Sequence, residues 1–232
     1  MALDRILDDL ACYLEHQLDE GITRIEVAPA RGAAAGPDDP AATRAALARI
    51  ADDVAACRQC ALHGARTRTV PGQGSPTPEI LFVGEAPGAE EDRAGLAFVG
   101  AAGQLLTRMI EAMGLTREEV FIANIVKCRP PGNRPPLPDE TQACLPYLKA
   151  QIGRLRPKVI VALGASAVKA LLDPAEGITR LRGRWHRCEG IDVMPTFHPA
   201  YLLRTPSAKQ DAWEDLKAVL TRLGRQPPPR SR

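Results

Sequence analysis

The chain has 232 residues, an apolar fraction of 45% and a formal net charge of +2, which suits one α/β-sized domain with a core of its own. A charge so close to balance neither requires nor excludes a polyanionic partner. Acids interrupt the apolar residues of the segment MALDRILDDLACYLEH, so we expect neither a signal peptide nor a membrane helix there. We therefore expect a cytoplasmic monomer that does not associate with a membrane.

Three segments of different composition divide the chain. Residues 1–20 carry leucine and isoleucine at the spacing of one helix face, and the stretch that follows is rich in Ala, Gly and Pro, which is typical of a flexible linker. The sequence therefore predicts an N-terminal helix and linker in residues 1–40, a main domain in residues 41–224 and a disordered tail in residues 225–232.

Strand and helix patterns alternate along the main domain. Helix patterns occupy residues 41–56, 103–113, 138–152, 165–172 and 208–223, and buried-strand patterns occupy residues 80–83, 120–126, 158–163 and 191–198. The Arg-rich segment at residues 177–190 is expected to form a hairpin or a sheet edge. Four strand–helix repeats with short connections predict a three-layer α/β/α sandwich with a central, mainly parallel four-stranded sheet.

Polar residues follow three of these strands. The sequence GEAPG comes directly after residue 83, Asn124 lies near the end of the second strand, and His198 ends the last one, where Pro199 fixes the next turn. Because the carboxyl ends of parallel strands meet at one edge of a sheet, these residues can converge on one crevice. The loop that contains GEAPG is long and acidic, which is typical of a ligand-binding loop, although an ordinary connection would also explain it.

Four of the six cysteines have a spacing typical of a metal or cluster site. Cys57 and Cys60 form a C-x2-C pair, Cys128 follows after 67 residues, and Cys144 follows after another 15. The second tight pair that is usual in structural zinc sites is missing, so an iron–sulfur cluster is at least as plausible as zinc. Unrelated buried thiols are the third interpretation. Two cysteines without a partner at ligand spacing are expected to be packing thiols, Cys12 and Cys188.

Five features together resemble one enzyme family. GEAPGAEED, FVGAAGQLL, NIVKCRPPGNRPP and FHPAYLLR occur in this order together with the four-cysteine spacing. The combination is similar to the family 4 uracil-DNA glycosylases, the iron–sulfur members of the uracil-DNA glycosylase superfamily, and the resemblance runs from about residue 57 to residue 223. It implies a DNA repair enzyme that flips deoxyuridine out of uracil-containing DNA and hydrolyses its N-glycosidic bond. It also implies a [4Fe-4S] cluster on Cys57, Cys60, Cys128 and Cys144.

The resemblance assigns roles in a uracil pocket. Phe98 would stack on the base, and the Asn124 amide would donate to O4 and accept from N3–H, a pattern that cytosine reverses. His198 would face O2 and stabilise the negative charge that develops on the departing uracil. The GEAPG loop would contribute the rest of the pocket wall through Gly84, Glu85 and Ala86.

Two glutamates compete for the role of handling the attacking water. Family 1 enzymes carry an aspartate at the position of Ala86 and a bulky aromatic that helps to exclude thymine at the position of Gly88. This chain resembles family 4 in lacking both. Glu85 is the first candidate for the catalytic carboxylate, and Glu91 is the second and could also exclude thymine. The other two loop acids are expected to be solvated, Glu90 and Asp92.

DNA binding requires phosphate contacts and an apolar wedge that fills the space of the flipped base. The resemblance places this wedge at Leu202, four residues after His198, with Tyr201 as the alternative. A basic rim is expected from four residues, Lys127, Arg129, Arg134 and Arg204.

Other functions fit parts of the pattern. A related cluster-bearing subgroup that traps DNA covalently carries GEQPG and a basic loop with a histidine, whereas this chain has GEAPG and no histidine in residues 130–138. A preference for hypoxanthine or xanthine is not distinguished by the sequence. A non-catalytic nucleic-acid-binding module with a structural metal site is disfavoured by the joint presence of Glu85, Phe98, Asn124 and His198.

Overall fold

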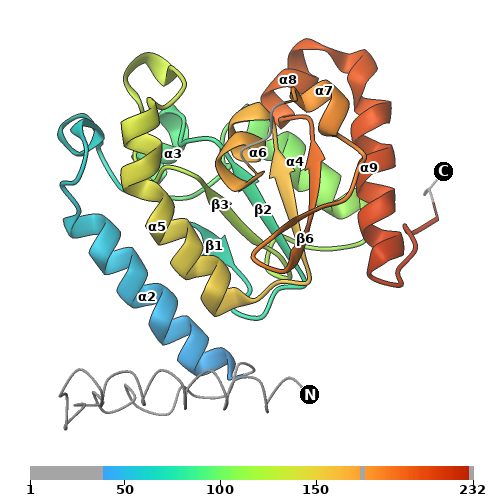
Figure 1. The fold of residues 1–232 in the computed structure, drawn as a ribbon, viewed down its shortest axis with the longest axis horizontal. Coiled ribbons are helices and arrows are strands. Elements are labelled where there is room, and N and C mark those ends of the chain that lie inside the picture. Colours follow the sequence, from blue (N-terminus) through green and yellow to red (C-terminus); the bar gives the residue numbers. More distant parts are fainter. Residues whose placement is uncertain (1–38, 173–175, 230–232) are drawn as a thin grey trace, which may run out of the picture. The chain divides into compact units, whose positions relative to one another are not determined.

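A mainly parallel sheet of six strands forms the centre of the structure, a computed structural model that describes residues 39–172 and 176–229. The helix and linker expected before residue 39, together with Cys12, lie outside the described residues. The strand order is β1-β3-β2-β4-β6-β5 (Figure 1). The strands are Gln73–Gly74 (β1), Ile80–Gly84 (β2), Phe121–Asn124 (β3), Val159–Leu163 (β4), His186–Cys188 (β5) and Ile191–Thr196 (β6).

The four strands that the sequence predicts are β2, β3, β4 and β6, and they pair in parallel. Two short antiparallel strands extend the sheet, because β1 pairs with β3 and β5 pairs with β6. The predicted count of four omits these edges, since strands of two and three residues are too short to show an alternating pattern. The β5–β6 hairpin confirms the sheet edge expected in the Arg-rich segment.

Helices cover both faces of the sheet, which confirms the three-layer arrangement (Figure 1). One hydrophobic cluster joins α5 and α6 to one face, and a second joins α4 and α9 to the other. Because both faces are covered, β2, β3 and β4 are buried along their whole length. The helices are Pro40–Ala56 (α2), Ala89–Ala94 (α3), Ala101–Ala112 (α4), Pro138–Leu155 (α5), Ala165–Leu172 (α6), Ile178–Leu181 (α7), Pro199–Arg204 (α8) and Lys209–Arg222 (α9).

Short helices at the sheet edge are the main local difference from the expected elements. The acidic loop contains α3, and α8 begins directly after His198. No helix in the described ranges is long and apolar enough to cross a membrane.

The carboxyl ends of the four parallel strands align at one edge of the sheet. Gly84 lies opposite Asn124, and Leu163 lies opposite Thr196. The chain leaves β2 toward β3 on one side and leaves β4 toward β6 on the other, so the direction of winding reverses between β2 and β4. Open α/β sheets bind ligands outside the strand ends at such a reversal, and the polar residues singled out in the sequence lie there.

Candidate active site and cysteine centre

A cavity of about 280 Å³ opens at this edge of the sheet. It brings together residues that are far apart in the sequence and that follow β2, β3 and β6. Its lining includes Glu85, Ala86, Gly88, Glu91, Phe98, Asn124, Pro130, Asn133, Arg134 and His198. The structure therefore gathers the expected base-binding side chains at one place, while Gly84 lies at the strand end behind them.

The amide of Asn124 is the polar group at the bottom of this cavity. The residue is 1% exposed, and its Oδ1 atom is buried without a hydrogen-bond partner among the described residues. A buried polar atom left unpaired costs about 1–3 kcal/mol, so the position suits a ligand that donates a hydrogen bond. A Cβ atom at Gly84 would lie 2.5 Å from both Asn124 Oδ1 and Phe98 Cζ, so only glycine fits beside them.

Phe98 forms an apolar wall of the cavity in a strained backbone conformation. Its φ angle is 55°, which is uncommon for a bulky residue. The ring is 6% exposed and lies 5.6 Å from the His198 ring between centroids. Gly103 allows the first turn of α4 to approach, because a Cβ atom there would lie 2.0 Å from the Phe98 carbonyl. Gln73 of β1 fixes the preceding residue by accepting from the Ala97 amide at 2.7 Å. A strained aromatic held from several sides marks a functional position.

His198 presents a hydrogen-bond donor to the cavity. The Ala200 amide donates to its Nδ1 atom at 3.1 Å, which places the proton of the neutral ring on Nε2. Burial of the ring and the positive charge of Arg204 lower the His198 pKa to about 4, and the Glu91 carboxylate opposes this shift. The imidazole is therefore neutral at physiological pH, with Nε2–H available to a ligand.

The two candidate glutamates have different surroundings. Glu91 accepts from three backbone amides, those of Gly88 at 3.1 Å, Val99 at 2.9 Å and Gly100 at 2.8 Å. Its carboxylate therefore holds the two ends of the acidic loop together. Glu85 instead accepts from the Ser166 hydroxyl at the start of α6. Ser166 is not among the residues expected from the sequence, although its position just after the end of β4 could have indicated it.

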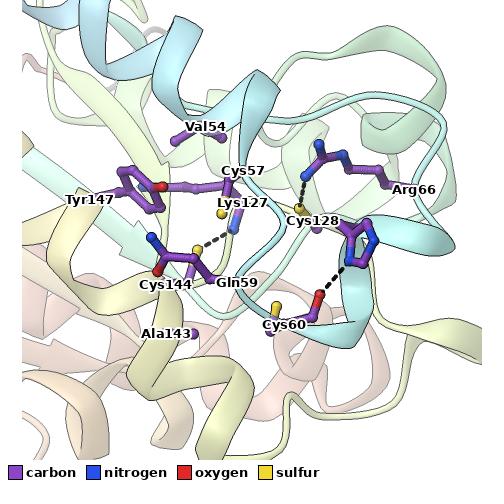
Figure 2. A pocket seen from close by; sticks show the side chains of 11 residues that line it. Val54, Cys57, Gln59, Cys60, Arg66, Lys127, Cys128, Ala143, Cys144 and Tyr147 are labelled. Atoms are coloured by element: carbon purple, nitrogen blue, oxygen red, sulfur yellow. Dashed lines mark hydrogen bonds between the residues drawn. The ribbon is translucent and has the colours of Figure 1, made fainter.

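Four cysteines line a second, small cavity (Figure 2). Cys57 and Cys60 follow α2, Cys128 follows β3, and Cys144 lies on α5. Two of the sulfur atoms accept hydrogen bonds, Cys128 from the Arg66 guanidinium at 3.2 Å and Cys144 from the backbone amide that precedes Cys128, also at 3.2 Å. The structure thus assembles the four cysteines that the spacing indicates, and Cys188 lies elsewhere, on β5.

Comparison with known proteins agrees with this geometry. A model of the "Uracil DNA glycosylase superfamily" matches residues 71–217. The chain belongs to the uracil-DNA glycosylase superfamily. A type-4 uracil-DNA glycosylase of Sulfurisphaera tokodaii is 47% identical over 75% of this chain and 83% of the relative. One of Thermotoga maritima is 49% identical over 68% and 83%. A type-5 uracil-DNA glycosylase of Pyrobaculum aerophilum is 31% identical over 58% of this chain and 67% of the relative.

Burial corrects three expectations about this superfamily member. Lys127 is 0% exposed and Leu202 is 1% exposed, so neither side chain is at the surface where DNA would bind. Asp92 is not a solvated loop acid, because it is 2% exposed and accepts from the Thr67 amide at 2.9 Å and the Arg68 amide at 3.4 Å.

The remaining basic residues of the expected rim reach the surface. Arg204 is exposed, and Arg129 and Arg134 are partly exposed. The Arg134 guanidinium forms two hydrogen bonds with the Glu140 carboxylate, at 2.6 and 2.8 Å, so part of its charge is already compensated. Next to the buried Leu202, the side chains of Tyr201 and Leu203 are 38% and 39% exposed.

The thiols of the cysteine centre are affected by burial. Burial raises the pKa of Cys144 to about 11 and also raises the pKa of Cys128, so these thiols need a cation in order to ionise. Among the described residues, no group of three His, Cys, Asp or Glu side chains converges tightly enough to hold a single metal ion.

The neutral state of His198 predicts a pH dependence. Because the folded-state pKa is lowered from 6.5 to about 4, the unfolded chain binds a proton between these values that the folded chain does not. The contribution to the free energy of unfolding is complete above pH 6.5 and is lost as the pH falls toward 4. We expect NMR of the His198 ring to show no protonation at pH 6, and a His198→Gln variant to lose this part of the acid sensitivity. A midpoint near 6.5 would contradict the prediction.

Proposed function

We propose that the chain is a type-4 uracil-DNA glycosylase that flips deoxyuridine out of DNA and hydrolyses the N-glycosidic bond, releasing uracil and leaving an abasic site. One observation carries the proposal. The buried, unpaired Asn124 Oδ1 faces a cavity that also presents an aromatic ring and a neutral histidine. An amide can read the edge of a pyrimidine, an aromatic ring can stack on it, and a neutral histidine can stabilise its departure.

Base selection follows from the Asn124 amide. Oδ1 accepts from uracil N3–H and the amide nitrogen donates to O4, while Phe98 stacks on the ring. Cytosine has an acceptor at N3 and a donor at the 4-position, so it leaves both buried amide groups mispaired. Sites built around buried hydrogen bonds reject such a substrate on the order of 10⁴-fold.

Bond cleavage follows from His198 and Glu85. As the bond between N1 and C1′ breaks, its electron pair moves to uracil, and the Nε2–H of His198 donates to O2, a term worth about 10²- to 10³-fold. Water adds to C1′ of the oxocarbenium-like sugar and gives its proton to a carboxylate. We assign the water to Glu85, because the Ser166 bond orients its carboxylate, whereas Glu91 is committed to three backbone amides.

The cysteine centre holds a [4Fe-4S] cluster in this proposal, on Cys57, Cys60, Cys128 and Cys144. When bound, the cluster cross-links three segments of the chain, and no step of the hydrolysis requires it to transfer electrons. The loop after Cys128 leads directly to Pro130, which lines the base cavity. The centre therefore has a structural role beside the pocket.

DNA would be held by Arg134, which lines the cavity, and by the surface residues Arg129 and Arg204. We assign the wedge to Tyr201, since Leu202 is buried. The Tyr201 ring lies 5.0 Å from the Phe197 ring between centroids, which restricts its motion, and the side chain is partly exposed. The monomeric state and the cytoplasmic location stay predictions.

Asn124→Asp tests the base-reading role. A carboxylate cannot donate to O4, so we expect the single-turnover rate on uracil to fall about 10²-fold and slow excision of cytosine to appear. The assay uses duplexes with U:G, U:A and C:G, single-stranded U, T:G and hypoxanthine. Gln210→Glu is the matched control, because it makes the same change from amide to carboxylate at an exposed position of α9 outside the cavity and should keep the uracil preference. Unchanged selectivity of Asn124→Asp would remove this residue from base reading.

Cys144→Ser tests the cluster. Native protein should be brown and contain iron and acid-labile sulfide, and the variant should lose both together with its visible absorbance. Cys188→Ser should retain them, because this thiol lies on β5 outside the centre. A colourless native protein with stoichiometric zinc would refute the cluster assignment.

Tyr201→Ala tests the wedge. We expect excision from duplex DNA to slow about 10-fold or more, with little change on single-stranded DNA or in thermal unfolding. Leu202→Ala should instead lower the free energy of unfolding by about 2–5 kcal/mol, because the side chain is buried. A duplex-specific loss in Leu203→Ala but not in Tyr201→Ala would assign the wedge to Leu203.

A further inference from the structure

The side chain of Lys127 is fully buried, 0% exposed, although lysine is rarely buried without a paired charge. Its ammonium donates to the backbone oxygen of Asn124 at 2.8 Å and to Gln151 Oε1 at 2.7 Å. Both acceptors are neutral, and in residues 39–172 and 176–229 no carboxylate pairs with the ammonium. The interior therefore holds a positive charge that the ordinary side chains around it do not balance.

The cysteine centre would carry negative charge close to this lysine when it holds a cluster. Lys127 directly precedes Cys128, its backbone amide donates to Cys144 Sγ at 3.2 Å, and it lines the same cavity as the four thiols (Figure 2). Four thiolates around an iron–sulfur centre leave it with net negative charge, and a buried charge is tolerated when an opposite charge lies near it. The lysine therefore has the position of a counter-charge.

The same ammonium also contacts the base pocket. Asn124 ends β3, and while its side-chain amide faces the cavity, its backbone oxygen accepts from Lys127. The second acceptor is itself anchored, because Gln151 Nε2 donates to the Pro71 carbonyl at 2.7 Å. The hydrogen bond thus fixes the backbone of the residue that, in the proposed function, reads the base.

We propose that Lys127 is a positioning residue that links the cysteine centre to the uracil pocket. Its charge stabilises the thiolate-bound cluster, and its hydrogen bond holds the Asn124 backbone at the end of β3. The inference rests on the proposed glycosylase function and its cluster, and it adds a reason why a hydrolytic site and a cluster share one short segment of chain.

Lys127→Met removes both the positive charge and the hydrogen bond to the Asn124 backbone, while keeping an unbranched side chain of similar length. In cluster-loaded protein challenged with an iron chelator, we expect visible absorbance to decay about 10- to 100-fold faster than in native protein. At equal cluster occupancy, the single-turnover rate on uracil should fall about 10-fold or more, whereas affinity for abasic-site DNA should be unchanged because Lys127 is not at the surface. Lys149→Met is the matched control, since this lysine of α5 is 55% exposed, and it should behave as native protein.

Lys127→Arg separates the two contributions. It keeps the charge, so absorbance should decay near the native rate, but its planar head does not reproduce the bond to Asn124, so excision should stay slow. If Lys127→Met excises uracil and loses its visible absorbance at the native rates, the proposal is overturned. If that variant does not fold, native excision together with fast decay in Lys127→Arg would overturn it. The native protein, measured first for colour and uracil excision, tests the proposed function itself, so the two failures are distinguishable.

Discussion

Parallel pairing of β2 with β3 sets Gly84 directly beside Asn124, and the geometry of the site depends on this register. The missing side chain at Gly84 leaves the space that Asn124 Oδ1 and the Phe98 ring fill. A slip of one residue would turn the Asn124 amide to the other face of the sheet. Both strands are buried on both faces, and the two hydrophobic clusters take alternate residues of β2, Leu81 and Val83 on one face and Ile80 and Phe82 on the other. Packing of the hydrophobic core therefore fixes the position of the Asn124 amide, a polar group that the core itself does not need.

The site contains local conformations that are unfavourable without a ligand. The positive φ of Phe98 and the unpaired Asn124 Oδ1 each cost about 1–3 kcal/mol. Glu91 and Gln73 hold the backbone on the two sides of Phe98 through side-chain hydrogen bonds. The acidity of the loop thus serves loop geometry more than chemistry, because Glu91 and the buried Asp92 are both committed to backbone amides. Glu85 is left as the loop carboxylate that faces the cavity and pairs with a side chain.

The convergence of residues at the strand ends depends on strand order and could be predicted from the sequence. The exposure of individual side chains depends on packing and could not. Asn124 and His198 could be placed because strand ends converge whatever the details of the loops. Lys127 was expected at the surface because lysine usually is, and only the contact with Gln151, distant in sequence, shows otherwise. The prediction that Leu202 is exposed was wrong for a related reason. The turn after His198 is helical, so α8 points Leu202 into a core with Leu105 and Phe197 and turns its neighbours outward. The edge strands β1 and β5 were too short to carry a pattern, and Ser166 becomes meaningful only once β4 lies beside β2.

The segment after β3 explains why a hydrolytic site would sit beside a cluster. Within eleven residues it runs from Asn124, which we propose reads the base, through Lys127 and Cys128 to Asn133 and Arg134 on the cavity wall. Asn133 has a φ of 55°, and the proline-rich segment between Pro130 and the start of α5 contains only the 3₁₀ turn Pro131–Asn133, so few helix or strand hydrogen bonds order it. An irregular wall must be fixed from elsewhere if a flipped base is to meet it at defined distances. Cross-linking Cys128 to α5 and to the cysteines that follow α2 through a common cluster would supply that fixation, and the buried ammonium of Lys127 would transmit it to the end of β3. In the proposed function, a cluster would act on catalysis through the position of a loop, with no change of its own oxidation state.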